Sequence, residues 1–121
     1  MEVFEVREPL LLIFIGRSHD EGRDVYDAVR WAWKVNVQRA REYELVLARY
    51  KKEVVGAYRP QEWLAATPGN FPGLKTAERG RWGFRGKPAE PEVWDYYVGK
   101  QVPNRYIGQN PVRYLRPEMM A

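Results

Sequence analysis

The sequence predicts a small α+β domain: a partly closed, mainly antiparallel β-barrel with one main helix near the N-terminus and short helical turns. Its 121 residues suffice for a single hydrophobic core. The apolar run at residues 10–15, between Pro9 and Gly16, is typical of a strand buried on both faces. One helical pattern and several short strand-like patterns follow, and this order favours a small barrel.

The main helix is predicted over residues 25–33. Asp24 is suited to be its N-cap, and Asp27 stands three positions later, where an acidic residue favours the helix dipole. The preceding residues 16–23 are expected to form a polar loop. The apolar positions with helical spacing are Val25, Ala28, Val29 and Ala32.

The rest of the chain predicts a hairpin and short elements separated by loops. Residues 43–50 alternate as a strand does, Lys51 and Lys52 form the turn, and residues 53–58 return. Asn36 is expected to cap a short helical turn. The remaining expectations are helical turns at 37–41, 60–64 and 91–96, a loop at 65–80, and strands at 81–85 and 112–115.

The expected organisation is one domain at residues 10–115. Residues 1–9 are interpreted as a leader or the stub of a preceding segment, and 116–121 as a flexible tail. The apolar run at 10–15 is much shorter than the roughly 20 residues of a membrane span, and the start of the chain is acidic and mixed rather than a secretory signal. A cytoplasmic protein without a membrane partner is expected.

The composition argues against catalysis. The chain has no cysteine, and His19 is its one histidine, which excludes thiolate chemistry and most histidine or zinc chemistry. Ser18, His19 and Asp20 are adjacent, but adjacency is not the geometry of a triad. No glycine-rich phosphate loop, metal cluster or paired carboxylates stand out. We therefore expect no enzyme, no cofactor and no metal.

The aromatic content favours stacking. Five Trp, eight Tyr and a net charge of +4 suit a partner with bases and phosphates, although rings also fill ordinary cores. On a helix, Trp31 and Trp33 would diverge by about 200°, so one ring would be buried and the other available. The available ring, between Arg30 and Lys34, could stack on a base. Alternatively, both rings cover the ends of the barrel.

Three further segments have a functional and a structural interpretation each. Arg59, at the exit of a predicted strand, could hold a phosphate or a carboxylate; alternatively, the segment is a proline-stiffened corner with Trp63 packed beneath it. Arg81 and Arg85 share one strand face and could touch a nucleic-acid backbone, with the aromatics simply turned inward. Near the C-terminus, Gln109 and Asn110 could read base edges or form a turn, and Arg113 could contact backbone.

Residues 17–19 offer an anion site rather than chemistry, because Arg17 and Ser18 stand in a loop that opens a helix. Residues 96–100 look like the second half of a GIY-YIG nuclease signature. No matching first strand precedes them at hairpin distance, and Glu118 is the one carboxylate in the expected tail. Nuclease activity of this chain is not expected.

Several stretches together resemble an uncharacterised bacterial domain that often follows a GIY-YIG nuclease domain. They span most of residues 10–115, and the most specific is 62–73, Glu-Trp-Leu-Ala-Ala-Thr-Pro-Gly-Asn-Phe-Pro-Gly. The strand–helix–hairpin order, with a tryptophan at the helix end, is similar in outline to PUA-like barrels of the EVE and YTH kind. This resemblance implies a base held in an aromatic cage and a role beside a nuclease or a defence system.

The leading hypothesis is a nucleic-acid-binding module that recognises a flipped or modified base of DNA or RNA. The alternatives are a protein-interaction or assembly module and a small-molecule nucleotide sensor. The residues expected to hold the base are Arg17, Ser18, Arg30, Trp31, Trp33 and Trp63. Those expected on the backbone are Arg59, Arg81, Arg85 and Arg113, with Gln109 and Asn110 on base edges.

Overall fold

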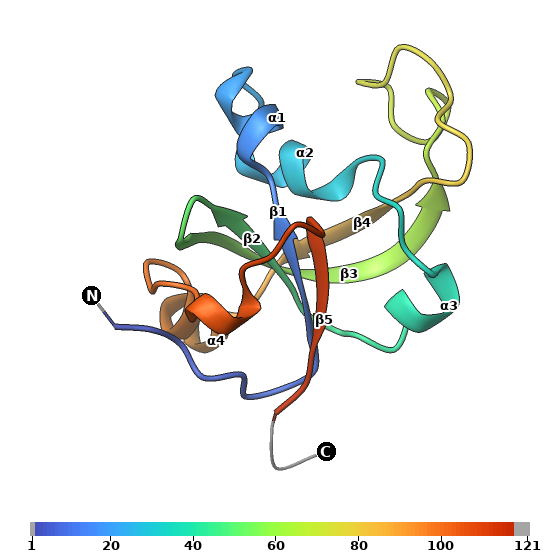
Figure 1. Cartoon of the computed structure of the whole chain (residues 1–121). Coiled ribbons are helices and arrows are strands. Elements are labelled where there is room, and N and C mark those ends of the chain that lie inside the picture. The colour runs from blue at the N-terminus through green and yellow to red at the C-terminus, as the bar shows by residue number, and fades with distance from the viewer. Residues whose placement is uncertain (1, 118–121) are drawn as a thin grey trace.

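A computed structural model describes residues 2–117, and its centre is one open, mixed β-sheet of order β4-β3-β2-β1-β5 (Figure 1). β1 and β2 are parallel neighbours, and every other pair is antiparallel. The strands are β1 (Leu10–Phe14), β2 (Val46–Tyr50), β3 (Glu53–Ala65), β4 (Trp82–Pro88) and β5 (Val112–Leu115). The predicted α+β class is confirmed.

Short helices surround the sheet, and the longest of them in residues 2–117 has seven residues. The expectation of one main helix is therefore wrong. The helices are α1 (Gly16–Asp20), α2 (Val25–Arg30), α3 (Val37–Ala40), α4 (Pro91–Tyr97) and the 3-10 turn η1 (Asn104–Tyr106).

β1 is buried on both faces, as its continuous apolar run predicts. Leu11 and Ile13 belong to a core cluster that includes residues of α2 and α3. Leu10 and Leu12 point to the opposite cluster, which includes Tyr97 of α4. The hairpin predicted around Lys51 and Lys52 is also confirmed, since Tyr50 pairs with Glu53.

α2 begins as predicted and ends earlier. The Asp24 side chain accepts a hydrogen bond from the Asp27 amide at 2.8 Å, so the N-cap is confirmed. The helix stops at Arg30, Trp31 is extended, and Ala32 has a φ of 54°. The indole of Trp33 donates to the Val29 carbonyl at 2.6 Å and occupies one of the acceptors that the helix end leaves free. Trp31 and Trp33 therefore lie beyond the helix.

Two other local expectations are wrong. Residues 16–20 form α1 rather than a loop, and the His19 ring contacts Tyr50 of β2, with ring centroids 4.7 Å apart. Residues 60–64 form the second half of β3 rather than a helical turn. Pro60 lacks an amide hydrogen, and the strand accommodates it with a register shift between Pro60 and Glu62. The expected turn around Asn36 and the strand at β5 are confirmed.

The sheet does not close into a barrel, although one segment lies between its two edges. Trp33 exchanges both backbone hydrogen bonds with Trp82 of β4, at 2.8 and 2.9 Å. The Asn36 amide donates to the Tyr114 hydroxyl of β5 at 3.2 Å. Figure 1 shows this segment running from α2 past β4 to α3. It therefore links the two edge strands without completing a strand ladder.

The segment before β1, interpreted above as a leader or stub, packs on the domain. Phe4 is fully buried in the cluster with Tyr97, and the Arg7 amide donates to the Tyr97 hydroxyl at 2.9 Å. Residues 2–9 therefore contribute to the core on that face. Of the expected tail at 116–121, residues 118–121 lie outside the described residues.

Candidate nucleic-acid interface

A hollow of about 550 Å³ brings together residues from three distant parts of the chain. α1 and the turn after it supply one wall, the segment after α2 a second, and the loop between β3 and β4 a third. We call it the tryptophan cleft. Its lining residues are Arg17, Ser18, Arg23, Trp31, Ala32, Trp33, Gly73, Leu74, Lys75, Thr76, Glu78 and Arg81.

Trp31 is held between a glycine and an arginine. A Cβ on Gly73 would lie only 1.9 Å from Cη2 of Trp31, so the indole packs directly on the Gly73 backbone. The guanidinium carbon of Arg23 lies over the ring, 4.5 Å from its centroid. The indole nitrogen is shielded from solvent and has no hydrogen-bond partner within residues 2–117. A donor left in this state is a feature that native structures rarely contain without a reason.

Trp33 and Arg81 connect the tryptophan cleft to a second hollow of about 330 Å³. Both residues line both hollows, and Lys34 and Asn110 line the second. Arg81 is fixed there by a hydrogen bond from Nη1 to the Ala32 carbonyl at 2.9 Å. The two hollows therefore form one continuous surface of indoles, cations and amides.

Positive charge predominates in these hollows. Their lining includes five cationic side chains and one carboxylate, that of Glu78: Arg17, Arg23, Lys34, Lys75 and Arg81 are the cations. Among the residues that the structure describes, only Arg17 of these five makes an ion pair, with Glu21 at 3.0 Å. Little of this charge is therefore neutralised by the residues that line the hollows.

The structure brings some of the predicted site residues together and leaves others apart. Arg17, Ser18, Trp31 and Trp33 line the cleft together, and Arg81 joins them. The idea that one indole is buried and the other available is wrong, because both are half-buried and both line the cleft.

Arg30 and Trp63, expected in the same pocket, do not line the cleft. Arg30 pairs with Asp27 at 2.7 Å, and its guanidinium lies 5.7 Å from the centre of the Trp31 ring. Trp63 is 6% exposed and packs against Phe84. It lines a separate hollow of about 440 Å³ with Arg41 and Tyr43, so it belongs to the core and to another surface.

Arg59 is engaged inside the molecule. Its guanidinium donates to both oxygens of Glu8 at 3.0 Å, to Glu90 at 2.7 and 2.9 Å, and to the Glu44 carbonyl at 3.0 Å. These carboxylates raise the pKa of Arg59, and Arg59 in turn holds the pKa of Glu90 below its usual range. Arg59 therefore fastens the segment before β1 to β3 rather than facing a ligand.

The other predicted contacts are also apart from the cleft or serve turns. Arg85 donates to the Asn70 carbonyl at 2.9 Å and to Glu62 at 3.3 Å. Arg113 donates to the Tyr106 carbonyl at 3.1 Å. Asn110 accepts from the Val112 amide at 2.9 Å, which closes the turn that its alternative interpretation expects. Gln109 is exposed and does not line either hollow.

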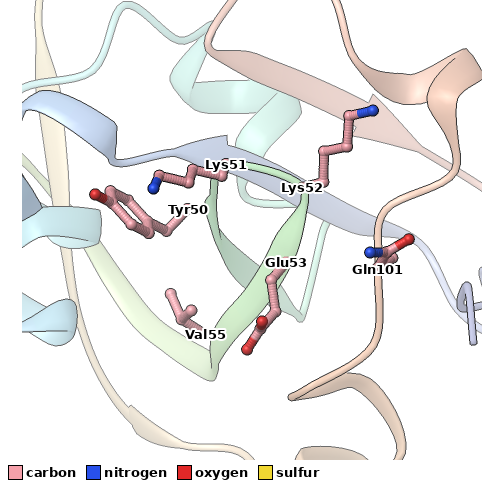
Figure 2. A pocket seen from close by; sticks show the side chains of 6 residues that line it. All are labelled: Tyr50, Lys51, Lys52, Glu53, Val55 and Gln101. Carbon is pink, nitrogen blue, oxygen red and sulfur yellow. The ribbon is translucent and has the colours of Figure 1, made fainter. Parts of the chain in front are cut away.

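A different hollow, of about 460 Å³, lies at the tip of the β2–β3 hairpin (Figure 2). Figure 2 shows Lys51 extending toward the Tyr50 ring and Lys52 extending away from it. The Lys51 amine lies 5.4 Å from the ring centroid, and the Tyr50 hydroxyl hydrogen-bonds Asp20 at 2.5 Å, which raises the pKa of Tyr50. Glu53 offsets part of the lysine charge. This hollow therefore has one ring and less excess charge than the tryptophan cleft.

Within residues 2–117, no group of three or more histidine, aspartate and glutamate side chains is arranged to hold a metal ion. Nor does any helix in that part of the chain have the length and apolarity of a membrane span. No protein-family model, curated protein or solved structure matches the chain.

The sequence reasoning missed Arg23, Gly73, Lys75 and Glu78 as cleft residues. Arg23 falls in the predicted polar loop at 16–23, and the other three fall in the predicted loop at 65–80. The loop reaches Trp31 only because β3 and β4 pair along their length and carry it to the same end of the sheet. No local pattern in the sequence signals that proximity.

Proposed function

We propose that this chain is a non-enzymatic nucleic-acid-binding module and that the tryptophan cleft is its binding surface. The observation that carries the proposal is the convergence of Arg17, Arg23, Lys75 and Arg81 around Trp31 and Trp33. Single-stranded nucleic acids are bound by this combination of a cationic groove and aromatic rings. In this proposal Trp31 and Trp33 contact bases, and the cations contact phosphates.

The finer architecture and setting are part of the same proposal. A PUA-like domain, related to EVE and YTH barrels, is supported by the strand–helix–hairpin order and by the Trp33 segment that links the two sheet edges. The resemblance to a domain found after GIY-YIG nucleases supports a nuclease or defence protein as partner. Because PUA-like barrels of the EVE and YTH kind hold a base in an aromatic cage, a flipped or modified base is the expected ligand.

The test is a titration of fluorescently labelled single-stranded DNA and RNA, with and without modified bases, over a series of salt concentrations. Binding with a dissociation constant below about 100 μM at low salt is expected, because non-specific binders usually reach that range. The logarithm of the affinity falls with the logarithm of the salt concentration, by about 0.7 for each phosphate contacted. Weaker binding to every oligonucleotide contradicts the proposal.

A matched pair of double variants locates the site. Arg17→Ala/Lys75→Ala removes two exposed cations from the cleft, and Lys51→Ala/Lys52→Ala removes two exposed cations from the hairpin tip. Both lower the net charge from +4 to about +2. The cleft variant is expected to weaken binding and to reduce the salt slope by up to about 1.4. An equal loss in both variants indicates attraction by net charge alone and contradicts a specific cleft.

The two alternative functions, a protein-interaction module and a nucleotide sensor, require different surface features. A protein-interaction module needs an apolar patch, and the exposed large hydrophobic residues of the described chain are Val3 and Phe14. Phe14 is covered in part by the Arg49 guanidinium, 4.3 Å from its ring centroid. A nucleotide sensor would use the same cleft, and tighter binding of free nucleotides than of oligonucleotides distinguishes it.

A further inference from the structure

Arg23 occupies the face of Trp31 on which a base would stack. Its guanidinium carbon is 4.5 Å from the ring centroid, that of Arg30 is 5.7 Å away, and the indole also packs on the Gly73 backbone. A flat ligand that stacks on the side of the ring covered by Arg23 must therefore displace Arg23. The indole nitrogen is buried and has no hydrogen-bond partner among the described residues.

The contacts that hold Arg23 in this position are few. Its guanidinium donates one long hydrogen bond, 3.5 Å, to the Ser18 hydroxyl, and no carboxylate of residues 2–117 pairs with it. Arg23 stands in the short connection between α1 and α2, directly after Gly22, whose φ is +94°. Arg59, by contrast, donates to two carboxylates and a carbonyl. Arg23 is therefore a cation that can change position at small cost.

We propose that Arg23 is a movable cover on Trp31 and that the ligand which displaces it is a nucleotide unit of a single strand. This inference rests on the proposed function. The base replaces the guanidinium on the indole, and the guanidinium turns to the phosphate of the same nucleotide. No net contact is lost, because the cation–π contact is exchanged for base stacking and a charge-assisted hydrogen bond. The site thus selects a heterocycle that carries a phosphate over a bare nucleoside.

The first experiment compares adenosine with adenosine 5′-monophosphate on the full chain, by calorimetric titration. The wild type is expected to bind the monophosphate about tenfold more tightly, the effect of one charge-assisted hydrogen bond. In Arg23→Ala, this preference is expected to fall to within about twofold, while adenosine binds as tightly as before or more tightly. Arg39→Ala is the matched control, because Arg39 lies 4.1 Å over the Tyr114 ring and lines neither hollow of the proposed surface.

The second experiment measures how far Arg23 shields the Trp31 ring when no ligand is present. Acrylamide quenching of the Trp31 fluorescence is obtained as the difference between each protein and its Trp31→Phe counterpart. Arg23→Ala is expected to increase the quenching constant of Trp31 by about twofold, because the guanidinium no longer shields the ring. Arg39→Ala is expected to leave it unchanged.

Each outcome bears on the inference. If the wild type binds oligonucleotides but Arg23→Ala behaves like Arg39→Ala in both experiments, the inference is wrong and the proposed function stands. If Arg23→Ala weakens adenosine and its monophosphate by the same factor, Arg23 is a fixed wall and the inference is again wrong. If the wild type binds neither oligonucleotides nor nucleotides, both proposals fail.

Discussion

The surroundings of Arg59 and the tryptophan cleft both contain arginine, but the two regions differ in how far the fold neutralises its charge. Around Arg59, two carboxylates and a carbonyl accept every hydrogen bond that the guanidinium donates, and its side chain is 21% exposed. In the tryptophan cleft, several cations face a hollow with Glu78 as the one carboxylate in its lining. The charge of Arg59 is neutralised within the protein, whereas the lining of the tryptophan cleft keeps an excess of positive charge.

This difference separates arginines whose charge the fold neutralises from arginines whose charge it leaves in excess, and the neighbouring residues in the sequence do not show it. Arg59 stands beside aromatic residues and a proline at the end of a predicted strand, which favours a ligand site. Its partners Glu8 and Glu90 lie 51 and 31 positions away in the chain, so that neutralisation is invisible locally. Arg23 lies in the connection between α1 and α2, and within residues 2–117 its side chain contacts the Trp31 ring and donates to the Ser18 hydroxyl. What decides the role is the number of acceptors that the fold supplies.

Among the variants proposed, Arg59→Met is expected to change folding stability most. The substitution leaves the carboxylates of Glu8 and Glu90 without their donor, and about 2 kcal/mol of folding stability should be lost. This is below the loss for a fully buried pair because solvent reaches the cluster. Oligonucleotide affinity should stay within about twofold of the wild type. Urea unfolding and the same titration check both, and a large loss of affinity in a folded variant would place Arg59 in the site.

Gly73→Ala is expected to disable the cleft while the fold remains. The new methyl group would lie 1.9 Å from the Trp31 ring, so the indole must move away from its present position. Stacking on one ring is worth roughly 1–3 kcal/mol, so affinity should fall about tenfold. Gly69→Ala in the same loop is the control, because the nearest atom to its Cβ would be 3.9 Å away. Equal affinities of the two variants would remove Trp31 from the binding surface.

Elements whose cause is local were predictable from the sequence. The buried run of β1, the Asp24 cap of α2 and the Asn36 cap of α3 each depend on residues within a few positions. The end of α2 depends instead on the pairing of Trp33 with Trp82. The second half of β3 depends on its ladder with β4, which overrides the turn that Pro60 indicates.

The candidate site was predictable only in its local parts. Trp31 and Trp33 can be selected from the sequence because they stand beside cations in one short segment. Arg17 and Ser18 can be selected because they precede a helix. Arg23, Gly73 and Lys75 complete the cleft through tertiary contacts. As an indole, Trp63 is expected from the sequence to hold the base together with Trp31 and Trp33. The sheet instead buries it against Phe84. Residue type indicates what a side chain can do, and the fold decides which side chains meet.

The ion pair between Arg59 and Glu90 is expected to make folding stability depend on pH. Arg59 lowers the pKa of Glu90 in the folded state, so this pair stabilises the protein above the ordinary glutamate pKa of about 4.5. That contribution is lost as the pH falls through the lowered value, because the unfolded state then binds the proton more readily. Unfolding midpoints measured from pH 6 to pH 3 should therefore fall less steeply in Arg59→Met than in the wild type. Parallel slopes would mean that the pair contributes nothing to acid sensitivity.

The smallest effect concerns the rim of the cleft. The Arg17 side chain is 94% exposed and its partner Glu21 is 54% exposed, so their pair adds little to stability. Arg17→Ala should weaken oligonucleotide binding only two- to threefold at low salt, with no difference near 0.5 M salt, where screening removes the effect of one distant charge. Glu21→Gln is expected to change the oligonucleotide affinity in the opposite direction. It releases Arg17 from its ion pair, so binding should become tighter by a similar factor. If both variants weaken binding, the substitutions have disturbed helix α1. If neither variant changes the affinity, Arg17 lies outside the path of the bound strand, and the cations that contact the strand are those deeper in the cleft.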